Sequence, residues 1–407
     1  MRKLEWIGVL GVFVAVATYG GRPVAGQQQM PRPYGTPPPL VITAFGGQPV
    51  TYQAPRTPWG DPDLQGVWSS DDLEGVGIAA GGGRGGRGGA PQNAQAGPPP
   101  LYLDEAALTA RREQVGKAAT TRDTTGESSF RFDYARRAFP QTRLLVDPAD
   151  GRMPALWPTA QNRIMPRGTY GAGPLDSWLD FSLYERCITR GIGGSILRVI
   201  YGNGNRIVQA PGVVALSYEM LPDTRIFYTD GRPRISQTIG QYLGDSRARW
   251  EGEELVVETT NLTDLTAFGV NGNGTRHSKA MRITERFRRV AADLVQYQAT
   301  WDDPLTYQAP FTVSFPLTPL DGGKLLPYDC HPGNTAISMS LSAERLEDRR
   351  LAEDLAKGIN RPRRAVQECG AGVGSAPVPG CGNAPAPAGG RGGRGGAANT
   401  GEDTIDR

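Results

Sequence analysis

Apolar and polar residues alternate along residues 281–289 regularly enough to assign two faces of a β-strand. The odd positions are Met281, Ile283, Glu285 and Phe287, and the even positions are Arg282, Thr284, Arg286 and Arg288. Because successive side chains of a strand point to opposite faces, this pattern predicts one apolar and one cationic face. Glu285 is the exception, since it places a carboxylate on the apolar face. Burying it costs several kcal/mol unless it is paired or protonated, so the position needs an explanation.

A run of short segments with strand composition contains this one. The segments are 206–209, 213–219, 224–229, 247–251, 254–260, 279–290, 294–301 and 311–317, separated by Gly, Asn, Asp or Pro. No helical crossover interrupts the run, so neighbours with short links should be antiparallel. A long meander tends to curl up rather than leave two open edges. We therefore expect a mainly β fold, an antiparallel meander forming a barrel or half-barrel with flanking short helices; a twisted β-sandwich is the alternative.

Two helices and several Gly- or Pro-rich segments surround the strands. One helix is expected over 104–115 with Asp104 as its N-cap, and another over 342–357, stopped by Gly358. The expected organisation is a signal peptide (1–26), a Pro/Gln-rich arm that packs little (27–57), a first strand segment (58–80), a Gly/Arg-rich linker (81–100), a barrel-like domain with terminal helices (101–361) and a disordered tail (362–407).

The N-terminus has the pattern of a secretory signal peptide. Arg2 and Lys3 precede an apolar run over 6–19, and the small residues at 24–26 fit a cleavage site. A membrane anchor is the alternative, but the apolar run is short for a span of about 20 residues. The pattern predicts a periplasmic or secreted protein with no membrane span after cleavage.

Four cysteines form an even set, for which three pairings are possible. We favour Cys187 with Cys330 and Cys369 with Cys381, because the first pair would join the two ends of the strand run. A loop of that length contributes about 4 to 5 kcal/mol in the chain-entropy model. Four free thiols are disfavoured in an oxidising compartment, and metal binding is disfavoured because no CxxC spacing occurs.

Composition excludes few functions. The chain has 407 residues and a formal charge of +3, so it can bury a large core, and electrostatics alone indicates no nucleic acid and no anionic membrane. Arg-Gly-Gly units occur within 81–89 and 391–396. Such units bind RNA in intracellular proteins, but without interleaved aromatics and with an export signal a flexible linker is favoured.

Several motifs resemble a large family of exported bacterial proteins of unknown function. They are DPDLQGVW (61–68), GDSR (244–247), RWEG (249–252), LVVETTN (255–261), HS (277–278), ERF (285–287) and CHPGN (330–334). The resemblance runs from about Trp59 to Arg345, and it implies an exported β-rich protein but no substrate. The expected barrel is also similar to the lipocalin-like, or calycin, architecture, which by fold analogy favours a small ligand.

Glu285 is the first candidate for chemistry. A short turn near residues 291–292 would place it opposite Tyr297, within one register step. The functional interpretation is a general acid or base with raised pKa, oriented by the phenol inside a cavity. The structural interpretation is a hydrogen bond, or an ion pair with an inward arginine such as Arg249. We favour the structural interpretation, because such networks also perturb carboxylates.

The chain has two histidines. His277 shares the parity of Glu285, but eight residues of extended strand would separate the two by about 26 Å. It follows the loop 268–276, so we expect it at the rim of a pocket, as a base or in a hydrogen bond. His331 is expected to serve local structure. A metal site would need distant segments to converge, so no metal ligands are assigned.

Known catalytic motifs are missing from the sequence: no GxSxG, HExxH or P-loop occurs, and Gly202-Asn203-Gly204 lacks the context of a dinucleotide site. No cofactor is therefore expected. Four aromatic residues could stack on a flat ligand or could belong to the core, namely Trp250, Trp301, Tyr228 and Tyr242.

These observations predict an exported protein that holds a small, partly apolar or carbohydrate-like ligand in its barrel. Its expected ligand-binding residues are Trp301, Trp250, Arg249 and Tyr228. The alternative is a cofactor-free hydrolase, lyase or isomerase that uses Glu285 and Tyr297, with His277 at the pocket mouth. A third hypothesis is a surface interaction protein that uses the Arg-Gly-Gly tails. Whether the protein is an enzyme stays open at this point.

Overall fold

The computed structural model describes residues 32–42, 50–79, 100–122, 135–163, 175–199, 201–272, 274–326, 328–331 and 333–361. The expected signal peptide, the expected linker up to residue 99, Cys369, Cys381 and the tail lie outside these ranges.

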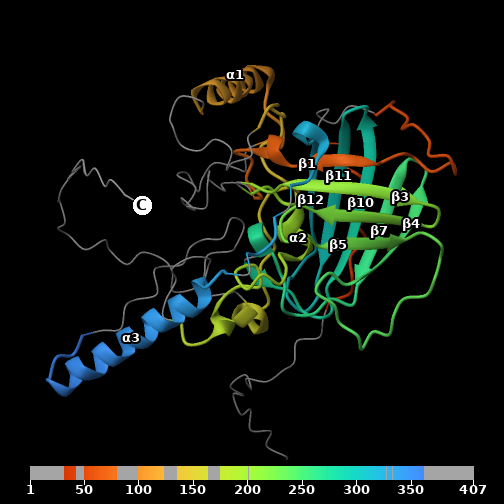
Figure 1. Ribbon diagram of the computed structural model, residues 1–407. Helices are drawn as coiled ribbons and strands as arrows, with labels where there is room; N and C mark the ends of the chain where they lie inside the picture. The colour runs from red at the N-terminus through yellow and green to blue at the C-terminus, as the bar shows by residue number, and fades with distance from the viewer. Residues whose placement is uncertain are drawn as a thin grey trace, which may run out of the picture.

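In the part of the chain described, ten strands form one sheet. They are β1 (Gly66–Ser69), β2 (Leu145–Asp147), β3 (Gly204–Ala210), β4 (Val213–Tyr218), β5 (Thr224–Tyr228), β6 (Asp245–Glu251), β7 (Glu254–Thr260), β10 (Arg282–Ala291), β11 (Leu294–Asp302) and β12 (Phe311–Pro319). Their order is β1-β3-β4-β5-β6-β7-β10-β11-β12-β2, and β1 also pairs with β12, which closes nine strands into a barrel (Figure 1). A separate short hairpin joins β8 (Ala267–Phe268) to β9 (Thr275–Arg276).

The expected mainly β barrel is confirmed, with one difference in strand direction. β5 and β6 run parallel and are joined through a single pair, Tyr228 with Arg247, whereas β6 and β7 pair along their whole length. The chain over 229–244 is long enough to return to the starting end of β5, so no hairpin forces the two strands to be antiparallel. The sheet is therefore mixed, and its weakest junction lies between β5 and β6.

The apolar face predicted for β10 lies inside the barrel. Ile283, Glu285 and Phe287 are all buried. The predicted register is wrong by two residues: Phe287, not Glu285, pairs with Tyr297, and Glu285 pairs with Ala299. A two-residue offset keeps every side chain on its predicted face, since the period of a strand is two.

Helices lie around the barrel. They are α1 (Glu105–Arg122), α2 (Gly191–Ile196) and α3 (Ala336–Ala356), with short 3-10 helices at η1 (Asp71–Leu73), η4 (Pro158–Arg163), η5 (Trp178–Asp180), η6 (Val270–Gly272) and η7 (Asp321–Gly323). Asp104 caps α1 as predicted, because its Oδ1 accepts the backbone N–H of Ala107 at 2.8 Å. α3 starts ahead of the predicted position and projects away from the barrel (Figure 1), and none of its residues is buried. Among the described residues, no helix is long and apolar enough to cross a membrane.

The described part of the Pro-rich arm packs against the barrel, so the expectation that it makes few contacts is wrong. Gln298 on β11 accepts the backbone N–H of Val41 at 2.7 Å and donates to the carbonyls of Pro38 and Pro39, each at 3.1 Å. Ser314 on β12 donates to the carbonyl of Val41 at 2.7 Å. β11 is buried at every position, because one face contacts the core and the arm covers part of the other.

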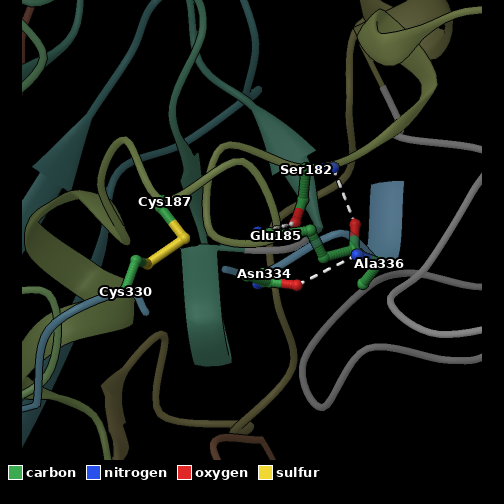
Figure 2. Close-up of a disulfide and its surroundings, with 6 residues drawn as sticks. All are labelled: Ser182, Glu185, Cys187, Cys330, Asn334 and Ala336. Carbon is green, nitrogen blue, oxygen red and sulfur yellow. Dashed lines mark hydrogen bonds between the residues drawn. A yellow bond between two sulfur atoms is a disulfide. The ribbon is translucent and has the colours of Figure 1, made fainter. Parts of the chain in front are cut away.

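The predicted disulfide between Cys187 and Cys330 is present (Figure 2), and it links residues 143 positions apart in sequence. Cys330 precedes α3, and Cys187 lies on the segment that leads into α2. The bond therefore joins the segment after the last barrel strand to the segment before the first of the β3–β12 run.

Candidate functional site

Glu285 is the centre of a polar network inside the barrel. Its two carboxylate oxygens accept hydrogen bonds from the Arg225 guanidinium at 2.8 and 2.5 Å, and Oε1 also accepts the Tyr297 hydroxyl at 3.0 Å. Arg225 in turn contacts the hydroxyl of Tyr218 at 3.2 Å and donates to Thr259 Oγ1 at 2.9 Å. We call the set Glu285, Arg225, Tyr297, Tyr218, Thr259 and Ser246 the Glu285 network.

Burial and charge act in opposite directions on this network. Burial alone would lower the pKa of Arg225, but the adjacent Glu285 carboxylate raises it above its usual value, so the guanidinium stays charged. Burial raises the pKa of Tyr218 to about 12, and it raises that of Tyr297 well above 10, with a further contribution from Glu285. Both phenols therefore remain protonated at neutral pH, and Tyr297 is a hydrogen-bond donor to Glu285.

This arrangement leaves Glu285 little capacity to act as a base. Its exposed fraction is 0%, and both oxygens accept hydrogen bonds from the Arg225 guanidinium. The ion-pair partner suggested from sequence, Arg249, instead lies on the outer face, where it bonds to Glu251 and Glu258. The geometry thus matches an ion-pair network, with Arg225 as the inward arginine.

His277 is buried rather than placed at an exposed rim, with 2% of its surface accessible. Its Nδ1 lies 3.0 Å from the carbonyl of Ser278, which can only accept, so Nδ1 carries the proton. Nε2 then accepts from the Thr266 hydroxyl at 2.6 Å. Burial lowers the pKa of His277, while the Ser278 bond and Asp303 raise it. Both ring nitrogens are engaged, which leaves no free nitrogen for proton transfer to a ligand.

The aromatic candidates separate into two groups. Trp301 is 2% exposed and packs edge-on against Phe268 at 4.8 Å between ring centroids, so it belongs to the core. Trp250 is half-buried and packs against the same core. Tyr228 and Tyr242 instead line a cleft in the barrel wall.

This β5/β6 cleft has a volume of about 770 Å³ and opens where the two parallel strands pair only once. Its lining comes from β5, β6, the connection 229–244 and the segment before α2. The residues are Ile188, Thr189, Asp223, Thr224, Arg225, Ile226, Tyr228, Arg232, Pro233, Ile235, Gln241, Tyr242, Leu243, Gly244, Asp245, Ser246 and Arg247. Two of them, Arg225 and Ser246, belong to the Glu285 network, so the base of the cleft reaches the buried charges.

The arginines at the cleft have carboxylate partners. Arg247 donates to Asp245 at 2.5 Å and Arg232 to Asp230 at 2.6 Å. Both guanidiniums also lie over the Tyr228 ring, at 5.3 and 3.9 Å from its centroid. The cleft therefore combines apolar surface with charges that are largely balanced within the chain.

Arg225 is the residue that the sequence analysis missed. It shares strand parity with Phe227, which is buried in the core, so the alternation along 224–228 already placed a guanidinium on the inner face. The alternation therefore indicated that Arg225 and Glu285 both point into the barrel, where an arginine and a carboxylate are expected to pair.

The chain was also compared with known proteins. No protein family, no curated protein and no solved structure matches it. The resemblance to an exported family thus has support only at the level of a β-rich barrel. Within the described ranges, no three His, Cys, Asp or Glu side chains gather as a potential metal site.

Proposed function

We propose that this protein binds a small, partly apolar or carbohydrate-like ligand in the β5/β6 cleft, rather than in the middle of the barrel. The observation that carries the proposal is the cleft at the parallel β5–β6 junction, where one residue pair replaces a full ladder. Its volume of about 770 Å³ lies within the range of small-molecule sites, about 300 to 1,000 Å³.

The lining favours a neutral ligand with both apolar and hydroxyl groups. Ile226, Ile235 and Leu243 supply aliphatic surface, and Tyr242 supplies a half-buried ring. Because Arg232 and Arg247 already have carboxylate partners, an anion would have to compete with Asp230 and Asp245. Fixed Arg–Asp pairs instead offer donors and acceptors in known orientations, which suits a polyhydroxylated ligand.

A binding experiment tests this proposal. Purified protein is titrated with a panel of neutral oligosaccharides and apolar alcohols, and binding is measured by calorimetry. A ligand of the cleft should lose at least about tenfold in affinity in Ile226→Ser and Tyr242→Ala, since each removes apolar contact area. Val208→Ser is the matched control, because Val208 is a similarly exposed strand residue that does not line the cleft. Equal affinity in Ile226→Ser, Tyr242→Ala and the control would place the ligand elsewhere and refute the proposal.

The same proposal places the protein outside the cytoplasm, as a periplasmic or secreted member of the exported family that its motifs resemble. The Cys187–Cys330 disulfide supports this location, because disulfides persist in oxidising compartments. The N-terminal pattern of Arg2, Lys3 and the apolar run at 6–19 adds to it. N-terminal sequencing of the exported protein should begin at Gln27, and an intact Met1 on the mature protein would contradict it.

The alternative is an enzyme, namely a cofactor-free hydrolase, lyase or isomerase that uses Glu285 and Tyr297. One observation supports it: Arg225 and Ser246 of the Glu285 network line the cleft. It requires the Arg225 guanidinium to break its hydrogen bonds to Glu285 first. His277 is buried, so it does not have the position at the pocket mouth that this alternative expected. Turnover of a cleft ligand that disappears in Glu285→Gln while binding persists would favour it over simple binding.

A further inference from the structure

A second buried arginine lies outside the Glu285 network and has no carboxylate partner among the described residues. Arg190, the residue before α2, is 1% exposed and is the largest of the fully buried side chains. Within the described part of the chain, none of its three guanidinium nitrogens has a hydrogen-bond partner. Arg225 is equally buried, but it donates to Glu285 and to Thr259. The two arginines therefore differ in whether the described part of the chain supplies a carboxylate beside the guanidinium.

Three tyrosines lie near the Arg190 guanidinium. It lies over the Tyr184 ring at 5.9 Å, and the phenols of Tyr201 and Tyr328 interact with it electrostatically. Tyr201 and Tyr328 stack on each other, with ring centroids 5.5 Å apart. Burial lowers the pKa of Arg190 to about 10, which still leaves it charged at neutral pH. A charged guanidinium among aromatic rings without a carboxylate is costly, and an anion bound beside it would remove that cost.

The outer wall of this site is the segment that follows η7. Tyr328 is 40% exposed and Leu326 is 69% exposed, so the segment lies at the surface. Two backbone contacts hold its described residues: the Tyr328 carbonyl accepts from the Leu221 N–H at 3.4 Å, and the Leu326 N–H donates to Glu219 at 3.0 Å. The disulfide joins Cys330, at the end of this segment, to Cys187 (Figure 2), which stands three positions before Arg190 in the sequence. Tyr328 is thus both partly exposed to solvent and an electrostatic neighbour of the Arg190 guanidinium, so displacement of its ring is the route by which a ligand would enter.

We propose that Arg190 is the anion-binding residue of a second ligand site, and that this site takes a small aromatic carboxylate. The planar guanidinium matches a carboxylate through two parallel N–H···O bonds. The rings of Tyr184, Tyr201 and Tyr328 contact the apolar body of the ligand, as offset or edge-on aromatic pairs do. Neither Arg190 nor the three tyrosines line the β5/β6 cleft, although Thr189 does, so the guanidinium forms a site next to the cleft and distinct from it.

Thermal unfolding of the full chain with sodium benzoate as the probe tests the proposal. At about one hundred times the dissociation constant, benzoate should raise the Tm of the wild-type protein by about 5 °C. Benzyl alcohol, which keeps the ring and lacks the carboxylate, should give no comparable shift. The control variant Arg206→Met removes an exposed arginine of β3 and should retain the full benzoate shift.

Two variants of Arg190 decide the outcome. Arg190→Met should abolish the benzoate shift and, without benzoate, melt at or above the wild-type Tm, because an unpaired buried charge has been removed. Arg190→Lys keeps the charge but not the planar fork, so it should bind benzoate at least about tenfold more weakly. Should Arg190→Met fail to fold, the Arg190→Lys titration decides. The absence of a benzoate shift in the wild type, or an equal affinity in Arg190→Lys, would overturn the proposal.

Discussion

Arg225 and Glu285 form a buried bidentate ion pair inside the barrel, with N–O distances of 2.8 and 2.5 Å. The side chains are 1% and 0% exposed. One comes from β5 and the other from β10, so the pair bridges strands that are not neighbours in the sheet. It therefore connects β5, at the weak β5–β6 junction, to β10 on the far side of β6 and β7, and it explains the carboxylate on the apolar face of β10.

Glu285→Gln should destabilise the protein, because it keeps the shape of the side chain but leaves Arg225 buried without a counter-charge. The unfolding free energy, measured by chemical denaturation, should fall by about 3 to 5 kcal/mol, the usual cost of removing one partner of a buried pair. The double variant Arg225→Met/Glu285→Gln should recover most of this loss, since no unpaired charge remains.

The matched control is Glu258→Gln, which removes a carboxylate that is 42% exposed and paired with Arg249 on the outer face. Its effect should stay below about 1 kcal/mol, as is usual for surface ion pairs. If Glu285→Gln lowers the unfolding free energy no more than Glu258→Gln does, the ion pair does not stabilise the fold. The turnover of a cleft ligand by Glu285→Gln would then be the measurement to make.

The Cys187–Cys330 bond should stabilise the fold from outside the barrel. The variant Cys187→Ser/Cys330→Ser should lose about 2 to 5 kcal/mol of unfolding free energy, because the cross-link restricts a long loop in the unfolded chain. Reduced wild-type protein should show a similar loss. Peptide mapping without reduction checks the pairing directly: Cys187 recovered with Cys369 or Cys381 would contradict the structure.

The alternation of residues along single strands was enough to predict the faces and the barrel. It placed Ile283, Glu285 and Phe287 inside, and those positions are buried. Hairpin register was less accurate, because it depends on how many residues the turn over 291–294 uses, and a two-residue offset leaves the alternation unchanged.

Long-range relationships could not be predicted from local pattern. The parallel direction of β6 depends on the course of 229–244, which has no periodic apolar pattern to reveal it. His277 was expected at a rim because a Gly- and Asn-rich loop precedes it, yet the hydroxyl of Thr266 and the carbonyl of Ser278 enclose its ring. Arg190 was not identified because nothing in the sequence around it, Ile-Thr-Arg-Gly-Ile, indicates that its guanidinium is buried and lacks a hydrogen-bond partner among the described residues.

His277 should make the unfolding free energy of the protein decrease as the pH falls below about 6.5. Burial lowers its pKa in the folded state below the value near 6.5 of an exposed histidine, so the unfolded chain takes up a proton first as the pH falls. The stabilisation is complete above about pH 6.5 and is lost as the pH falls from there toward the folded pKa. The slope for one proton reaches at most about 1.4 kcal/mol per pH unit.

Chemical denaturation between pH 7.5 and 5 measures this slope. His277→Asn should have a flatter profile than the wild type in that window, whatever its stability at pH 7.5. His331→Asn is the control, because His331 is exposed. A profile for His277→Asn that runs parallel to the wild type would show that His277 does not contribute to the pH dependence.

Gln298 should hold the Pro-rich arm on the outer face of β11. Gln298→Ala removes the bonds to Val41, Pro38 and Pro39, each worth about 1 kcal/mol net, so local release of the arm should become at least about fivefold more populated. Limited digestion with chymotrypsin measures this release as faster cleavage after Tyr34 and Leu40, while the Tm of the barrel changes little.

Gln209→Ala is a matched control for this prediction, because it removes an equivalent glutamine that secures a different segment. Gln209 on β3 accepts the backbone N–H of Leu64 at 2.7 Å and donates to the Pro62 carbonyl at 3.0 Å. Its loss should leave cleavage after Tyr34 unchanged. If Gln298→Ala and Gln209→Ala are cleaved there at the wild-type rate, the arm is held by Arg32 and Ser314 instead, since these also bond across the arm and the barrel. Faster cleavage in Gln298→Ala alone would establish that one side chain of β11 fixes the arm to the barrel.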